Sequence, residues 1–510
     1  MPKKSKKDPL SRLSDFDIKR ASLLVFSTAF FIRLLLNVIF FERFGYRAVQ
    51  YQEIWFYYGV AQGKFSLMAL DPTVPILKAV NIFFGDFLIY GIVIAGIALS
   101  SLTSVFLFLL VRKLHDSRTG IFAGLLYAAL SFSSSLTTAG FTHDLVAVPI
   151  IVLIMYLAVI SSGGHLPKLL MLLLIVVGAS VNPMVVFGVF AVMTHFAMQK
   201  SDKGFGKFAK NFLWIVFAAL LIRLLFYQEI LDYIAVLAFK YRSIDLLIQQ
   251  RFSEDLLPPD LDILAIGYNF LWILAPIGIL ISLKKRDSMS PSLFLLGILA
   301  VSVMSKGTRI LDLGMCMTGA VGFANLKKYQ SYAMPFLAIF ALSNLAIASY
   351  YSPSDFTQTE YEVFTWLEEN TGPGDTLYAK WAYGYTLQAL SNLEPVSTPE
   401  RIRPEIYSIL WLQDEKEMAN GMSLLGARYV LLSEEDFFFY EDAKRFHVVM
   451  KESMFPIYKS GAGEALLPEI KKTMIYRLLY DGELRQFTVL KEWKDPDTEL
   501  RYRVLEFRPL

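Results

Sequence analysis

A succession of apolar segments, each close to the length that crosses a lipid bilayer, fills residues 21–351 and constrains this chain more than any other feature. A helix needs about 20 apolar residues to cross the hydrocarbon core. The chain is 55% hydrophobic and 19% charged, whereas soluble proteins carry about a quarter charged residues. The composition therefore predicts a membrane protein, and the net charge of +3 gives no indication of nucleic-acid binding.

Hydrophobicity predicts about eleven spans of roughly 15–28 residues. The first apolar segment lacks a small-residue cleavage site, so we expect it to stay in the membrane as an anchor behind the basic tail of residues 1–20. Two long outer loops are expected, at 43–85 and 229–263. The expected spans are 21–42, 86–111, 120–138, 145–161, 167–181, 183–198, 208–228, 264–283, 290–304, 309–325 and 333–351.

Basic residues indicate which way the chain is inserted, because short cytoplasmic loops are enriched in Lys and Arg. With the N-terminus inside, most inner loops carry a basic cluster, such as Lys284, Lys285 and Arg286. An odd number of spans then places residues 352–510 outside the cytoplasm. We expect Ser391 to be an exposed position of this outer domain.

Acidic residues lie among aromatic ones in the expected outer loops. Glu53 and Glu254 belong to the two long loops, and Asp144 directly precedes a span. Carboxylates that converge at the water boundary can hold Mg²⁺ or Mn²⁺, which suits diphosphate chemistry. The alternative is that each is a solvated loop acid. The single cysteine, Cys316, excludes disulfides and a cysteine metal site.

Charged residues inside spans are costly and are therefore candidates for function. Arg309 lies near the outer end of its span, where its planar guanidinium can clamp a lipid diphosphate. The alternative is an ion pair with Asp312, one helical turn away. Arg33 and Arg223 lie deeper, and we interpret them as polar packing contacts within the helix bundle.

The outer domain has the sequence pattern of a small mixed α/β domain. A helix at 359–370 and a strand at 376–380 are followed by a helix at 413–425. Strands are then expected at 427–433, 487–493 and Arg501–Phe507. The fold predicted for the whole chain is thus a polytopic helical membrane domain followed by a mixed α/β extracytoplasmic domain.

Trp381, Tyr383 and Gly384 lie just inside this domain, after its first strand. Aromatic faces beside a permissive backbone suit a pocket for an extended peptide. The alternative is that the two aromatic residues pack in the core of the domain.

Taken in order, these residues resemble the catalytic subunit of oligosaccharyltransferase, a family of GT-C membrane glycosyltransferases that moves a glycan from a lipid carrier to asparagine. Residues 53–58, EIWFYY, are similar to the family's first-loop Asp-Pro-Trp-Phe-Asn-Tyr, with Glu53 in place of the metal-binding aspartate. Residues 140–146 are similar to the second acidic motif, in which Asp144 is the acid.

The resemblance continues toward the C-terminus. Residues 252–254, FSE, are similar to the family's Ser-Val-Ser-Glu, whose glutamate helps to hold the acceptor asparagine, and this implies that role for Glu254. Arg309 falls where the family has an arginine on the lipid diphosphate. Residues 380–384, KWAYG, stand where the family has Trp-Trp-Asp-Tyr-Gly, which binds the Ser or Thr hydroxyl of the acceptor. Ala382 has no group that accepts this hydroxyl.

The resemblance implies a GT-C fold and a metal-assisted transfer with inversion, in which Glu53 and Asp144 hold Mn²⁺ or Mg²⁺. The implied partners are a polyprenyl-linked glycan donor, an acceptor protein or peptide and membrane lipid. Two alternatives stay open. One is a GT-C enzyme that uses a polyprenyl monophosphate-sugar donor on a lipid or polysaccharide. The other is a non-catalytic relative, which Lys380 and Ala382 favour and which the acids Glu53, Asp144 and Glu254 argue against.

Overall fold

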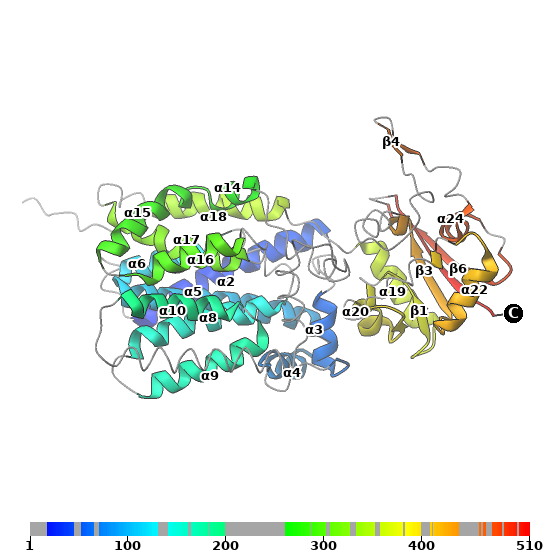
Figure 1. Cartoon of the computed structure of the whole chain (residues 1–510), viewed down its shortest axis with the longest axis horizontal. Coiled ribbons are helices and arrows are strands. Elements are labelled where there is room, and N and C mark those ends of the chain that lie inside the picture. Colours follow the sequence, from blue (N-terminus) through cyan, green and yellow to red (C-terminus); the bar gives the residue numbers. More distant parts are fainter. Residues whose placement is uncertain are drawn as a thin grey trace, which may run out of the picture. The chain divides into compact units, whose positions relative to one another are not determined.

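The structure is a computed structural model of the chain, and its described residues form two compact units with a boundary between Ser354 and Asp355. Helices build the first unit, and a sheet with helices builds the second (Figure 1). The residues described are 18–44, 53–65, 71–130, 141–161, 165–182, 184–198, 261–285, 287–301, 307–326, 333–351, 357–380, 383–398, 409–410, 412–437, 458–460, 463–465, 472–481, 484–496 and 499–509.

The first unit is helical because a backbone in hydrocarbon must satisfy its hydrogen bonds internally. Its helices run side by side (Figure 1). They are α2 (Ile18–Phe44), α3 (Glu53–Gln62), α4 (Thr73–Phe84), α5 (Leu88–Leu114), α6 (Ser117–Ala129), α8 (His143–Ile160), α9 (His165–Val181), α10 (Val185–Met198), α14 (Leu261–Tyr268), α15 (Leu271–Lys284), α16 (Met289–Val301), α17 (Thr308–Asn325) and α18 (Ala333–Tyr351).

Within the described ranges, three helical stretches are long and apolar enough to cross a membrane: Ile18–Ile39, Thr73–Leu114 and His143–Ile160. Each expected span overlaps a helix of the structure, except 208–228, which lies outside the described residues. Several helices expose large apolar side chains outward, as lipid-facing surfaces do, for example Phe31 at 65% and Leu280 at 71%. The number of spans stays a prediction.

The segment expected as the first outer loop, 43–85, contains two helices, α3 and α4. Helix α4 continues through the short 3₁₀ turn Gly85–Phe87 into α5, which makes one apolar stretch from Thr73 to Leu114. Asp71 directly precedes α4, and its Oδ1 accepts a hydrogen bond from the Thr73 backbone N–H at 2.8 Å. This contact fixes the start of α4.

Helix α17 packs against α15 and α16 with its backbone close to theirs. A Cβ atom on Gly278 of α15 would lie 1.7 Å from the Thr318 carbonyl oxygen of α17. On the other side, a Cβ on Gly314 of α17 would lie 2.5 Å from the Phe294 Cα of α16. Small residues at such contacts let membrane helices approach closely. Helix α17 is thereby held on two sides.

Arg33 is fully buried in α2 and has polar contacts inside the bundle, in agreement with the packing role expected for it. Its guanidinium lies 3.3 Å from the Ala29 carbonyl oxygen and 3.4 Å from that of Tyr127. It also lies 3.5 Å from the Ser104 hydroxyl. Arg223 lies outside the described residues.

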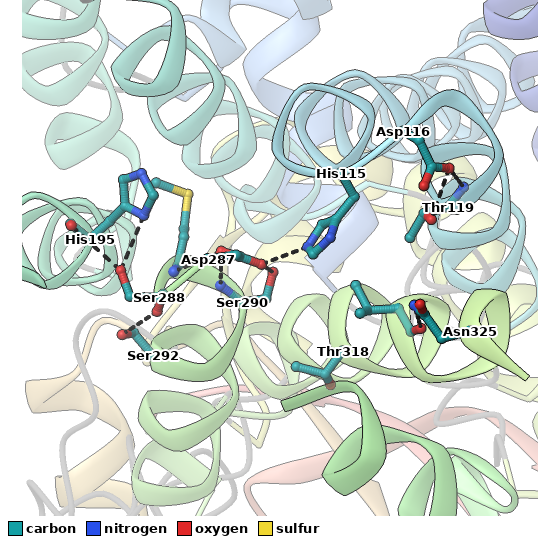
Figure 2. Close-up of polar contacts among 12 residues, drawn as sticks. His115, Asp116, Thr119, His195, Asp287, Ser288, Ser290, Ser292, Thr318 and Asn325 are labelled. Atoms are coloured by element: carbon teal, nitrogen blue, oxygen red, sulfur yellow. Dashed lines mark hydrogen bonds and ion pairs between the residues drawn. The ribbon is translucent and has the colours of Figure 1, made fainter. Parts of the chain in front are cut away.

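A cluster of polar side chains joins the ends of α5 and α10 to the start of α16 (Figure 2). His115 Nε2 lies 2.8 Å from Asp287 Oδ2, and both side chains are buried. Asp287 Oδ1 accepts hydrogen bonds from the backbone N–H groups of Met289 and Ser290, at 3.0 and 3.2 Å. Burial acts to raise the pKa of Asp287, but hydrogen bonds from His115 and Ser290 outweigh it and hold this pKa below its ordinary value.

The second unit is built on a five-stranded sheet in the order β2-β1-β3-β7-β6. Strand β1 pairs in parallel with β2 and β3, whereas β7 pairs antiparallel with β3 and β6. The strands are β1 (Thr376–Tyr378), β2 (Glu394–Pro395), β3 (Tyr429–Ser433), β6 (Phe487–Lys494) and β7 (Arg501–Phe507), and the main helices are α19 (Gln358–Asn370), α22 (Glu415–Leu424) and α24 (Met474–Tyr480). A separate hairpin pairs β4 (Tyr458–Ser460) with β5 (Gly463–Ala465).

Both faces of this sheet are covered, as the alternation along β3 shows. Tyr429 and Leu431 pack into the core that also holds Phe364 of α19. Val430 and Leu432 point to the opposite face and pack with residues of α22 and α24. Every residue of β3 is buried, which explains why its sequence is apolar on both sides.

The expectation that Ser391 is exposed is wrong. Ser391 ends the π-helix Leu387–Ser391 and is only 3% exposed, because its hydroxyl points inward and donates a hydrogen bond to the Phe364 carbonyl oxygen at 3.1 Å. Leu424, at the end of α22, is 89% exposed. The second unit therefore offers one accessible and one inaccessible position for chemical labelling.

These two positions test the expected topology. We predict that Leu424→Cys reacts with a membrane-impermeant thiol reagent on intact cells, since the basic inner loops place residues 352–510 outside the cytoplasm. The native Cys316 is buried and gives little background. Ser391→Cys is the matched control and should stay unlabelled. Labelling of Leu424→Cys only after lysis would contradict the topology.

The buried carboxylate of Asp287 gives a prediction on stability and pH. Asp287→Asn should lower the unfolding free energy at pH 7 by about 1–3 kcal/mol, because His115 and the first turn of α16 lose a charged acceptor. Since folding lowers the pKa of Asp287 from 3.8, its contribution is present above that value and is lost as pH falls through the folded pKa. The difference between wild type and variant should therefore narrow in strong acid.

Thermal unfolding in detergent between pH 7 and pH 3 measures this difference, with the substitution of the exposed Asp86 by Asn as control. An Asp287→Asn protein as stable as wild type at pH 7 would show that the His115–Asp287 contact contributes nothing.

Candidate functional site

Two of the residues singled out from the sequence meet at the starts of two helices. Asp144 is the second residue of α8, and Arg309 is the second residue of α17. They are 165 positions apart in the chain, yet Arg309 Nε lies 3.5 Å from Asp144 Oδ2. The carboxylate is 7% exposed and the guanidinium side chain 19%. The pair therefore lies just beneath the surface, with the arginine the more accessible partner.

The contact with Asp144 gives Arg309 a partner from another helix. The alternative from the sequence was an ion pair with Asp312, which is fully buried one turn further along α17. In the structure, Asp312 Oδ1 accepts a hydrogen bond from the Tyr268 hydroxyl at 2.8 Å. The same hydroxyl lies 3.3 Å from the Thr308 carbonyl oxygen. Tyr268 thus fixes the first turn of α17, on which Arg309 stands.

Asn182 completes the surroundings of Asp144 and was not predicted as a site residue. Its side-chain Nδ2 donates a hydrogen bond to Asp144 Oδ1 at 2.8 Å. Its Oδ1 accepts one from the Met184 backbone N–H at 2.9 Å, which orients the amide. A signal existed in the sequence, because Asn182 is the one residue left between two expected spans on the outer side. Asp144 therefore has one polar contact for each carboxylate oxygen.

His143 lies beside Asp144 and contacts two further segments. Its Nδ1 is 2.6 Å from the Tyr57 hydroxyl of α3, and its Nε2 is 3.4 Å from Asp71 Oδ2. Burial acts to raise the pKa of Asp71, but hydrogen bonds from His143 and Thr73 outweigh it and hold this pKa below its ordinary value. Neither Tyr57 nor Asp71 was singled out from the sequence.

The side chains at this site include part of what a hard divalent cation needs as ligands. Asp144 supplies carboxylate oxygens, which are the ligands that Mg²⁺ and Mn²⁺ prefer. Glu53, the second ligand expected, begins α3, four positions before Tyr57, but its side chain lies outside the described part of the structure. Among the described residues there is no group of three or more His, Cys, Asp or Glu side chains placed to hold a metal.

Two further predicted site residues, Glu254 and Trp381, lie outside the described ranges. Tyr383 is described and is 1% exposed. Its ring packs at 5.2 Å from that of Phe364, and its hydroxyl donates a hydrogen bond to Glu360 Oε1. This is the core position that the alternative interpretation assigns to it. Its part in peptide binding stays a prediction.

Lys380 joins the same buried network. Its ammonium group lies 4.1 Å from the centre of the Tyr383 ring and 3.9 Å from Glu360 Oε1. The carboxylate also closes the capping box of α19, since Glu360 Oε2 accepts a hydrogen bond from the Thr357 backbone N–H at 2.8 Å. A lysine in place of the first tryptophan of the family motif is therefore matched by an acid inside the domain.

The structure explains why residue 384 is a glycine. A Cβ atom on it would lie 2.8 Å from the Thr398 Cα and 3.0 Å from the Ser397 carbonyl oxygen. A side chain at this position would collide with the neighbouring backbone. Gly384 therefore lets the segment after Tyr383 pack closely against residues 397–398.

Part of the chain matches a known protein family, and its fold is similar to that of solved structures. Residues 75–227 match the family of dolichyl-phosphate-mannose-protein mannosyltransferases. No curated protein sequence matches the chain. The match includes Asp144 and Asn182, and it ends before Arg309.

Among solved structures, the chain is similar to the archaeal oligosaccharyltransferase AglB from Archaeoglobus fulgidus. The complex of that protein with an inhibitory peptide and a dolichol-phosphate gives a TM-score of 0.68 at 14% sequence identity, covering 94% of this chain and 80% of that one. An oligosaccharyltransferase from the same organism, tethered to an acceptor peptide with an NVT sequon, gives 0.67 at 14% identity, with the same coverage. Its complex with zinc and sulfate gives 0.67 at 15%, covering 93% and 79%.

At these identities the likeness shows the fold. The fold that the resemblance implies is thereby confirmed: the chain has a helical unit followed by an α/β unit, a fold similar to that of this oligosaccharyltransferase.

Proposed function

We propose that this chain, oligosaccharyltransferase-like by its fold, transfers a glycan from a polyprenyl diphosphate-linked donor to an asparagine of a protein acceptor at the outer membrane face. The proposal is supported most by the contact between Asp144 and Arg309. Each was chosen from the sequence for a separate reason, one as a metal-binding acid and the other as a clamp for the donor diphosphate. Their proximity is what one site acting on one phosphate group requires.

Arg309 is suited to the leaving group. Breaking the bond between the sugar C1 and the diphosphate oxygen leaves negative charge on the diphosphate, and a guanidinium close to that oxygen stabilises the charge. Asp144 and Tyr268 hold Arg309 in place before the donor arrives, so little reorganisation is needed. The 19% exposure of the Arg309 side chain leaves it accessible to a phosphate.

The acceptor side of the reaction is assigned by resemblance. Glu254 would accept hydrogen bonds from the acceptor amide nitrogen and orient it toward the sugar C1, on the face opposite to the leaving diphosphate. The amide nitrogen would form the new bond to C1 as the bond from C1 to the diphosphate oxygen breaks, and its proton would pass to the Glu254 carboxylate. The peptide would be bound by Trp381, with Tyr383 and Gly384 shaping the segment around it.

A divalent cation held by Glu53 and Asp144 would supply charge neutralisation for the leaving diphosphate. Asp144 has the appropriate oxygen donors, and Asn182 holds the carboxylate in a fixed orientation. The structure of the Archaeoglobus fulgidus oligosaccharyltransferase in complex with zinc and sulfate supports a metal site in a protein of this fold.

A second candidate function is favoured by the family match over residues 75–227. The name of that family describes a donor with a single phosphate, dolichyl-phosphate-mannose. A monophosphate needs less positive charge than a diphosphate, so Arg309 without a metal can suffice for it. The two donors therefore predict different dependence on metal ions.

The decisive assay uses the purified chain with either donor, a diphosphate-linked oligosaccharide or a monophosphate-linked sugar, and a library of acceptor peptides. We expect transfer from the diphosphate donor only, with loss of activity in EDTA and recovery with Mn²⁺ or Mg²⁺. Glu53→Gln should lower turnover by at least about 100-fold, since it keeps the size of the side chain and removes its charge. The substitution of Glu362 by Gln, on α19, is the control.

Transfer from the monophosphate donor alone would establish the second function in place of the first. Diphosphate transfer that survives both EDTA and Glu53→Gln would rule out the metal. Absence of transfer with every donor and peptide would support the non-catalytic alternative.

The acceptor rule gives a further prediction. A hydroxyl buried without a partner costs about 1–3 kcal/mol, so a site that supplies the partner discriminates in favour of Ser or Thr. Ala382 cannot supply it, and wild type should therefore prefer Thr over Ala at the +2 position only weakly. Ala382→Asp should raise this preference by about tenfold for each 1.4 kcal/mol gained.

The measurement is relative transfer to peptides that differ only at +2, in wild type and in Ala382→Asp. Discrimination of several hundredfold in the wild type would show that another group binds the hydroxyl.

A further inference from the structure

Three segments of the first unit meet at His143, the first residue of α8. Tyr57 comes from α3, and Asp71 from the residues that lead into α4. Tyr57 and His143 are 86 positions apart, so the contact joins parts of the chain that no local structure brings together. Asp71 has a fully buried side chain, and Tyr57 is 2% exposed. The His143 side chain is 28% exposed, so the network is buried on the side of Tyr57 and Asp71.

The Tyr57 hydroxyl makes two hydrogen bonds to His143. Its oxygen accepts one from the His143 backbone N–H at 2.9 Å. A second joins the hydroxyl to His143 Nδ1, 2.6 Å away. On the other side of the ring, Nε2 lies 3.4 Å from Asp71 Oδ2. Both ring nitrogens of His143 therefore face polar groups of the protein.

Ring packing and the start of α4 make this arrangement rigid. The Tyr57 ring lies edge-on to the His143 ring at 5.2 Å and close to that of Phe141 at 5.1 Å. Asp71 is fixed in turn by its hydrogen bond from the Thr73 backbone. Asn81 of α4 donates a further hydrogen bond to the Ala61 carbonyl oxygen of α3, at 3.3 Å. Helices α3 and α4 are therefore fastened to each other and to α8.

Glu53 and Asp144 are the neighbours of this network in the chain. Glu53 precedes Tyr57 by four residues, which is one turn earlier in α3. Asp144 directly follows His143. We propose that Tyr57, His143 and Asp71 are positioning residues that hold α3 against the start of α8 and thereby set the separation between Glu53 and Asp144. The proposal rests on the proposed function for what this separation serves.

The network acts on the two acids through the backbone, because His143 directly precedes Asp144 and Tyr57 lies one turn after Glu53. Groups that orient the ligands of a metal typically change its affinity by about 10–100-fold when they are removed. Loss of the Tyr57 hydroxyl should have an effect of this kind while leaving the fold intact, since Phe keeps the ring and its packing.

The test compares wild type, Tyr57→Phe, His143→Gln, His143→Ala and the control Tyr156→Phe, which alters a half-buried tyrosine elsewhere in α8. Mn²⁺ binding to the purified protein is measured directly by electron paramagnetic resonance, without donor or acceptor. Hydrogen exchange of residues 54–62 reports on the attachment of α3. Thermal unfolding shows that each variant is folded.

We expect Tyr57→Phe to weaken Mn²⁺ binding by about tenfold and to speed exchange in α3, with Tyr156→Phe unchanged in both. His143→Gln should be affected less than His143→Ala, because an amide can accept from Tyr57 and donate toward Asp71. Mn²⁺ binding that is the same in Tyr57→Phe and in wild type would overturn the proposal.

The outcome for wild type separates this inference from the proposed function. If wild type binds no Mn²⁺, the metal-assisted function is refuted. The attachment of α3 is then judged by exchange alone, and equal exchange of residues 54–62 in Tyr57→Phe and wild type would refute it as well. If wild type binds Mn²⁺ but transfers no glycan, the positioning role can still be decided by the variants.

Discussion

A backbone in hydrocarbon has no water to bond with, and the first unit follows from this constraint. Its apolar segments become helices, whose unpaired backbone groups remain only at the helix ends. Polar side chains therefore gather there. Asp144 and Arg309 stand in the first turns of α8 and α17, and Asp287 precedes α16 and satisfies the N–H groups of its first turn. The proposed chemistry uses charged side chains at the starts of two of these helices.

The second unit follows a different constraint, because its sheet has to be buried on both faces. Strand β3 is buried on both faces, so helices must cover both. One face is covered by α19, whose capping acid Glu360 also takes the hydroxyl of Tyr383 and lies near Lys380. The segment proposed to bind the acceptor is thus connected to the start of a helix through one carboxylate. A substitution of Lys380 or Glu360 would therefore change the conformation of this segment.

Much of this could be predicted from the sequence, and the remainder has physical reasons. Hydrophobic length indicated the helices. Asp144 was singled out as an acid at the expected outer boundary, and Arg309 as a charge inside an expected span. Their contact could not be predicted, because no local pattern links residues 165 positions apart. Asp71 was missed because an acid in a loop is ordinary until its partner is known. Ser391 was placed wrongly because a π-helix turns its hydroxyl inward, and a pattern of polar residues does not show this.

The glycines on either side of α17 have a mechanical consequence. At Gly278 and Gly314 the backbone of this helix is so near those of α15 and α16 that not even a methyl group fits between them. Rotation or translation of α17 would have to separate it from both neighbouring helices at once. Arg309 therefore stands on a helix whose position is fixed by its packing. If the site has to open for a bulky lipid carrier and close over it, we expect the movement in the other elements around Arg309.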